Sequence, residues 1–363
     1  MDILNMQMML LPLVWPLLLG GFFLHVIPDL ARPELFFGVT VDPRFRQSEL
    51  ARGIRRRYSV AIWIATLIAV VLAVTAAFAA AGAFAAPVLA VLATRAGLRR
   101  VPWMLQVAVG IWAFVQANRA ARAHATQRAS VVEVELSTRP DSQSTIVAIL
   151  AVPIASLAVL AAWTGLRWRD VPSRVAVHWT FNGPDRWVAT TPATVAMLLS
   201  LHAVVCLLFA LLAWGVFHGS RRVATYGEAA RREQRFRARI VLLLLSVEYF
   251  AVFPAWAALL GLPGTAMRAW MLAFPTTILI LQAILVLAGQ GGSRGLARSG
   301  SAVVGDRTDD HYWTWGLFYF NRADPAFLVE KRFGVGYTFN FAHPFAWALL
   351  TLIAAIPLLG RLL

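Results

Sequence analysis

The chain has 363 residues, of which 59% are apolar, and a formal net charge of +15. Several apolar runs approach twenty residues with few or no charges, which is the length that an α-helix needs to cross a bilayer core. This composition argues against a soluble globular protein. The runs are continuous, whereas the strands of a transmembrane barrel would alternate apolar and polar residues.

Almost all of the positive charge is arginine, because Lys331 is the only lysine. The arginines lie beside apolar runs instead of forming one basic face with aromatic or amide side chains between them. Nucleic-acid binding would need such a face, so the sequence predicts no nucleic-acid partner. A disulfide within the chain is excluded, because Cys206 is the single cysteine.

Eight membrane spans are predicted from these runs, and the fold class is an all-α polytopic membrane protein. The first run has no basic segment before it and no small-residue cleavage pattern, so we expect a retained span and not a removed signal peptide. Between residues 60 and 117 a long tilted helix or a re-entrant segment is the alternative. The predicted spans are approximately 3–27, 60–81, 101–117, 145–166, 194–217, 240–262, 269–288 and 341–360.

The spans divide the chain into four predicted parts. Residues 1–140 form an N-terminal membrane unit of about three spans, and 141–220 and 221–303 form two hairpins of two spans each. Residues 304–363 hold a polar aromatic motif and the last span.

The arginines predict the orientation of these spans. Most of them lie in the connections after the first, third, fifth and seventh spans, which places that side in the cytoplasm. Both termini and the connection 167–193 then face away from it. The dense basic segments 44–58 and 221–239 act as anchors or, alternatively, as a docking surface for a partner or for anionic lipid.

A polar stretch at residues 171–187 separates the fourth and fifth spans. Val175 and Val177 alternate with polar neighbours, as in a short strand, and the segment 181–185 has the residues of a turn. We therefore expect a small strand-turn element in which His178 and Asp185 pair across the turn.

Recognition of a molecule outside the membrane is the alternative role of this element. One histidine and one carboxylate are too few for a zinc site, so no metal and no cofactor are predicted. The residues that would form the recognition surface are His178, Asn182, Gly183, Asp185 and Trp187.

With its flanking spans, this stretch resembles the short extracytoplasmic domain of unknown function in SdpI-type immunity and sensor membrane proteins of bacteria. The resemblance covers roughly residues 145–217 and rests on Pro172, His178, Gly183, Asp185 and Trp187. It implies an integral protein of the bacterial cytoplasmic membrane. In the namesake branch it also implies protection against a secreted membrane-active toxin and capture of a transcriptional repressor. The lysine that commonly precedes the following span in such domains is not present here.

A second motif, residues 310–344, precedes the last span and resembles another uncharacterised domain that accompanies the first in some bacterial membrane proteins. Its aromatic runs 313–320 and 326–332 flank a turn at 321–325, which predicts a cytoplasmic β-hairpin. We expect an aromatic cap on the helices or a docking site. A nucleotide site would need a helix directly after the glycines. The motif residues are Trp315, Tyr319, Asn321, Asp324, Lys331, Arg332 and Asn340.

Three polar side chains, those of His202, Glu248 and Gln282, lie inside predicted spans. An unpaired charge at mid-membrane costs about 3 kcal/mol, so Glu248 must face the helix bundle or be protonated. If their helices are neighbours, the three side chains would converge as a proton or ligand path. The alternative is a buried hydrogen-bonded pair that fixes helix packing.

The function predicted from these features is non-enzymatic immunity or envelope sensing. In this hypothesis the outer element meets a secreted peptide or toxin, and the basic cytoplasmic face meets a regulator. No His-Glu-x-x-His pair and no carboxylate cluster suited to two-metal chemistry occurs in the sequence. Two alternatives stay open. One is a proton-coupled transporter that uses Glu248 and His202, and the other is a membrane-embedded enzyme on lipid substrates with His178 as base and Asp185 as its orienter.

Overall fold

The computed structural model is mostly helical, and the chain groups into two compact units. The first unit comprises residues 1–130, 305–318 and 331–335, and the second comprises 131–304, 319–330 and 336–363. The C-terminal motif therefore contributes to both units. The structure describes residues 3–80, 100–126, 143–180, 183–220, 227–292 and 308–359.

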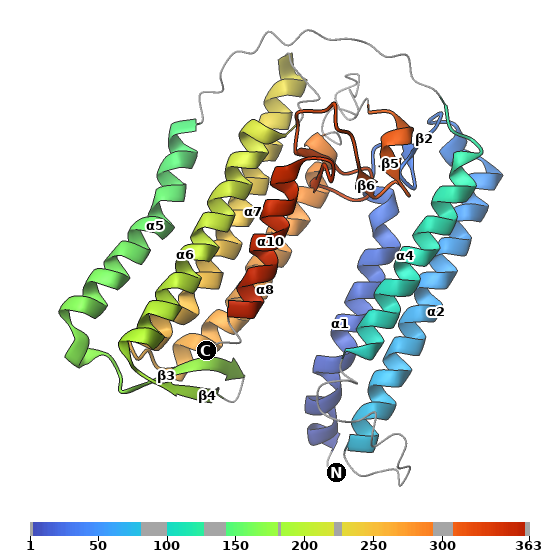
Figure 1. The fold of residues 1–363 in the computed structure, drawn as a ribbon. Coiled ribbons are helices and arrows are strands. Elements are labelled where there is room, and N and C mark those ends of the chain that lie inside the picture. The colour runs from blue at the N-terminus through green and yellow to red at the C-terminus, as the bar shows by residue number, and fades with distance from the viewer. Residues whose placement is uncertain are drawn as a thin grey trace. The chain divides into compact units, whose positions relative to one another are not determined.

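Among the described residues, three helices form the frame of the first unit: α1 (Ile3–Leu30), α2 (Glu49–Ala80) and α4 (Val101–Arg122). They run side by side in Figure 1. The buried amide of Gln106 on α4 joins all three, because its Nε2 donates to the Leu17 carbonyl at 2.8 Å and to Thr66 Oγ1 at 2.9 Å. A polar side chain used in this way holds helices together where apolar packing alone is not specific.

Residues of the first unit also form two tight turns, each between two short strands. Strands β1 (Leu35–Phe36) and β2 (Val39–Thr40) pair antiparallel around the Phe37-Gly38 turn. Strands β5 (Trp313–Thr314) and β6 (Phe318–Tyr319) pair around Trp315 and Gly316. The two central residues of each turn have positive φ, as a type I′ turn requires. The single-turn helices η1 (Phe45–Gln47) and η5 (Asp310–Tyr312) lie nearby in the sequence.

In the residues that the structure describes, the second unit contains five α-helices. They are α5 (Gln143–Leu166), α6 (Pro192–Trp214), α7 (Gly227–Leu259), α8 (Gly264–Ala288) and α10 (Pro344–Leu359), with the short segments η2 (Trp168–Asp170), η3 (Gly215–Gly219) and η4 (Gln290–Gly292). Helix α6 begins where the sequence favours a start. Thr191 caps it by accepting a hydrogen bond from the Thr194 amide, and Pro192 occupies the first turn, where no amide donor is needed.

Two hairpins of the second unit pack at opposite ends of α6 and α7. Strands β3 (Arg174–Thr180) and β4 (Gly183–Ala189) join a cluster with Val195 near the start of α6 and Leu259 at the end of α7. Strands β7 (Leu328–Glu330) and β8 (Tyr337–Phe339) pack with Phe217 just beyond α6 and with Val241 of α7.

Five of the described helices are long and apolar enough to cross a membrane. Two further apolar helical segments, Ala151–Leu166 and Pro344–Leu358, are shorter. Within the described ranges, eight long helices lie at the predicted positions, but the count of eight membrane spans stays a prediction. The five candidate spans are Leu13–Leu30, Glu49–Ala79, Pro192–Gly219, Ala230–Leu259 and Gly264–Gly292.

The prediction of a hairpin with its turn at residues 321–325 is wrong, because the strands on either side of this segment do not pair with each other. The strand before this segment, β6, pairs backward with β5, and the strand after it, β7, pairs forward with β8. Residues 321–325 therefore link two strand pairs. The positive φ of Trp315, and of Gly334 and Gly336, allows the chain to reverse at two other places.

Candidate functional site

The β3–β4 hairpin carries the His178–Asp185 pair predicted from the sequence. His178 Nδ1 lies 2.5 Å from Asp185 Oδ1, and the two side chains are 63% and 49% exposed. The strand register shifts on both sides of His178. Such a bulge changes the direction of a side chain relative to the regular strand.

The opposite side of the hairpin is anchored to the helices. Val175 is buried and Val188 half-buried in the cluster that Leu160 and Ala258 share. At the strand ends, the Thr190 amide donates to the Ser173 carbonyl at 2.9 Å. The hairpin therefore presents an exposed polar pair on a backbone that apolar burial holds in place.

The other residues of the predicted recognition surface have different surroundings. Trp187 is exposed, and Gly183 has a φ of 122°, which side chains other than hydrogen rarely allow. Asn182 lies outside the described residues. Of the predicted surface, the structure brings together His178 and Asp185.

A second polar site lies between α6 and α7. His202 and Glu248 are almost fully buried, at 2% and 1% exposure. The Cys206 thiol, one helical turn after His202, lies close enough to the Glu248 carboxylate to interact with it. Both ring nitrogens of His202 and one oxygen of Glu248 have no hydrogen-bond partner among the described residues. Gln282, in contrast, is exposed on α8.

Cys206 was not predicted as a site residue, although a signal for it was present. It follows His202 by four residues, so the two share one face of an α-helix. Its packing with Val205 and Val252 places the thiol in the α6–α7 interface. Within the described ranges, no group of three His, Cys, Asp or Glu side chains is arranged to hold a metal ion.

Part of the C-terminal motif belongs to the second unit, and there a network of hydrogen bonds surrounds the buried side chain of Asn340. Its Oδ1 accepts from the Asn321 amide at 3.1 Å and from the Ala342 amide at 3.2 Å. Its Nδ2 donates to the carbonyls of Asn321, Asp324 and Ala326. The Tyr319 hydroxyl donates to Asp324 Oδ2 at 2.9 Å. These contacts fix a loop, as a structural role requires.

Arg332 belongs to the first unit and is also fully engaged. Its guanidinium pairs with Asp310, donates to the carbonyls of Gly38 and Thr308, and lies 4.9 Å from the centre of the Trp313 ring. A phosphate would have to displace these partners. Trp315 and Lys331 are exposed.

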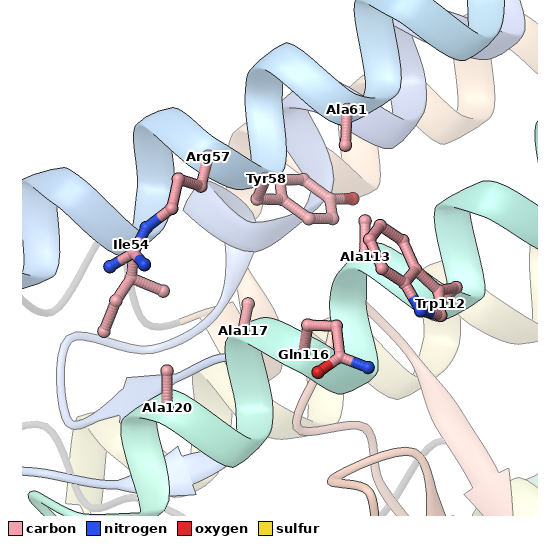
Figure 2. A pocket seen from close by; sticks show the side chains of 9 residues that line it. All are labelled: Ile54, Arg57, Tyr58, Ala61, Trp112, Ala113, Gln116, Ala117 and Ala120. Carbon is pink, nitrogen blue, oxygen red and sulfur yellow. The ribbon is translucent and has the colours of Figure 1, made fainter.

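Two hollows are formed by described residues of the first unit. The first hollow has a volume of about 220 Å³ and lies between α2 and α4. Its walls are mainly apolar and include alanines of both helices and Trp112 (Figure 2). Arg57 stands at its edge. The other, of about 420 Å³, lies where the end of α1 meets the start of α2, and four arginines line it. The sequence indicated a basic segment there but not a pocket.

Comparison with known proteins finds a family that matches the C-terminal motif. The sequence pattern of a family of unknown function, DUF5808, matches residues 322–347, which include Asp324, Arg332 and Asn340. No curated protein and no solved structure matches the chain. The C-terminal motif is thus similar to a family whose function is itself unknown.

Proposed function

We propose that this chain is an integral protein of the bacterial cytoplasmic membrane that senses, or protects against, a secreted peptide or toxin in the manner of SdpI-type proteins. The β3–β4 hairpin is its recognition element and faces away from the cytoplasm. The five long apolar helices and the sequence resemblance of residues 145–217 support this proposal.

The observation that carries the proposal is the exposed His178–Asp185 pair on an anchored hairpin. Asp185 engages one ring nitrogen and thereby sets the orientation of the imidazole, which leaves Nε2 to bond a ligand. An arriving molecule meets a fixed donor–acceptor group on a hairpin that also carries the exposed Trp187, so little side-chain order has to be gained on binding.

The same exposure argues against catalysis by this pair. The two groups are within the reach that a base and its orienter need. A base acts most effectively where water is excluded and charges interact in a low dielectric. Both side chains are about half exposed or more, which suits recognition of a ligand better than chemistry on it.

A challenge experiment tests the recognition role. Cells that express the full chain, or its His178→Ala or Asp185→Ala variant, are exposed to secreted membrane-active peptides, and survival is measured together with the amount of protein in the membrane. We expect each variant to lower survival at least tenfold at equal protein level.

Asp170→Ala is the matched control, because Asp170 is an exposed carboxylate in the same connection and pairs with Arg167. We expect it to leave survival unchanged. Unchanged survival in the two hairpin variants would contradict the recognition role.

Proton-coupled transport is the second candidate function, favoured by the buried groups between α6 and α7. His202 and Glu248 have unpartnered polar atoms within the described part of the chain, at a depth where such atoms are costly. A transported proton or cargo group would satisfy them during part of a cycle.

Liposomes that contain the purified chain test this candidate, because a pH-sensitive dye inside them measures proton flux. Glu248→Gln keeps the shape of the side chain but removes the titrating group, so we expect flux to fall at least tenfold. The exposed amide variant Gln282→Ala should retain it. Equal flux in wild type and Glu248→Gln would exclude the transport role.

A further inference from the structure

We propose that the pocket between the end of α1 and the start of α2 binds the phosphate headgroup of an anionic lipid. The pocket, called here the arginine pocket, has a volume of about 420 Å³ and is lined by Arg46, Arg52, Arg55, Arg56, Asp29 and His25, among others. This inference rests on the membrane location proposed above.

Part of the positive charge in the arginine pocket is already used by the protein. Arg55, whose side chain is 19% exposed, donates to both carboxylate oxygens of Asp29 and to the His25 carbonyl. Arg52 pairs with Glu49 at 2.6 Å. These bonds hold the walls of the pocket in shape and cancel two of the four charges.

The remaining two arginines carry the charge that a ligand would meet. Arg46 donates one hydrogen bond, at 3.0 Å, to the Arg32 carbonyl. Burial lowers the pKa of Arg46, and the neighbouring Arg55 adds to this effect, while Asp29 and Glu34 oppose it. The cation is thus incompletely compensated. Arg56 is exposed and has no partner among the described residues. A bound anion would compensate both, and arginine is well suited to phosphate oxygens.

The position of the pocket indicates that the anion belongs to a lipid. The candidate spans Leu13–Leu30 and Glu49–Ala79 both have an end at this pocket. Val60 and Ile64 follow Arg56 at intervals of four residues, so all three share one face of α2, and both apolar side chains are exposed. A phospholipid with its phosphate at Arg46 and Arg56 would lay its acyl chain along this face. Basic residues at the edge of a span commonly bind anionic headgroups in this way.

Binding to defined lipids tests the proposal. The purified full chain in neutral detergent is titrated with phosphatidylglycerol, phosphatidylcholine or inorganic phosphate, and the dissociation constant is measured from tryptophan fluorescence. We expect phosphatidylglycerol to bind at least tenfold more tightly than phosphatidylcholine. The double variant Arg46→Gln, Arg56→Gln should weaken this binding at least tenfold, and Arg56→Gln alone should weaken it about threefold.

Arg57→Gln is the matched control. It removes the same charge from the next position of α2, but Arg57 lies at the α2–α4 hollow (Figure 2) and does not line the arginine pocket. We expect less than a twofold change. Equal weakening by Arg56→Gln and Arg57→Gln would show an effect of net charge alone and overturn the proposal. Equally tight binding of inorganic phosphate would overturn the assignment to lipid.

Fractionation of cells measures how much of each variant is in the membrane. This measurement separates the lipid site from the proposed membrane location. If wild type is absent from membranes, the location fails. If all variants are in membranes but bind phosphatidylglycerol equally, the lipid site alone fails.

Discussion

At the scale of single residues, Asn340 shows how one amide side chain can organise a loop. Its two polar atoms bond five backbone groups from residues 321 to 342, and the side chain is fully buried. An alanine can replace none of these bonds. A buried backbone group that loses its partner costs about 1–3 kcal/mol.

We therefore expect Asn340→Ala to lower the free energy of unfolding by about 2–4 kcal/mol, because several backbone groups lose their partner at once. Thermal unfolding of the purified protein in detergent measures this loss. Gln282→Ala removes an amide that is exposed on α8 and should change stability by less than about 0.5 kcal/mol. Similar unfolding midpoints for the two variants would contradict the role assigned to Asn340.

At the scale of elements, the first unit depends on two turns that meet through glycines. A Cβ on Gly38 would lie 2.7 Å from Gly316 Cα, and a Cβ on Gly316 would lie 2.7 Å from Asn118 Nδ2. Asn118 in turn donates to the Phe37 carbonyl at 2.7 Å. The backbones thus approach closely only because neither turn carries a side chain at this point, and the φ of 78° at Gly38 adds a second demand for glycine.

Gly38→Ala should lower the free energy of unfolding by about 2–4 kcal/mol, since the new methyl group meets backbone and the left-handed conformation is strained. Gly53→Ala provides the contrast. Gly53 lies within α2 with no atom within 4 Å of an added Cβ, so alanine should raise stability by about 0.5–1 kcal/mol through its helix propensity. Chemical denaturation in detergent measures both, and a loss of stability in both variants would contradict this account.

At the scale of the whole molecule, the arrangement of the second unit bears on sidedness. The β3–β4 and β7–β8 hairpins pack at opposite ends of α6 and α7. If these two helices cross a membrane, the hairpins lie on opposite sides of it. The distribution of arginine then predicts that β3–β4 is outside.

Cysteine labelling measures this sidedness. In a Cys206→Ser background, Trp187→Cys places a thiol on β4, and Arg322→Cys places one in the exposed part of the C-terminal loop. A charged maleimide cannot cross hydrocarbon, so we expect intact cells to be labelled at position 187 and not at 322. Opening the membranes should expose both thiols, and equal labelling of both in intact cells would contradict the predicted topology.

Much of the fold could be predicted locally, because local chemistry decides it. Apolar runs placed the long helices, and the alternating valines with the polar residues after them predicted a strand-turn element in which His178 contacts Asp185. The strand pairing of the C-terminal motif could not be predicted in this way. Aromatic, β-prone segments are compatible with several partners, and the choice depends on which turn tolerates positive φ and on what each strand packs against.

The sequence by itself determined that the chain is mostly helical, with apolar helices long enough to cross a membrane, because helix length and apolar composition are properties of contiguous residues. Only the tertiary structure decided which polar groups meet. Cys206 lies beside Glu248, whereas Gln282 is exposed. Arg332 is buried against Asp310 and Trp313. Arg46 and Arg56 line one pocket, while Arg57 lines another. Contacts of this kind depend on how the faces of separate helices are rotated toward each other, and that rotation is set by packing between elements distant in the sequence.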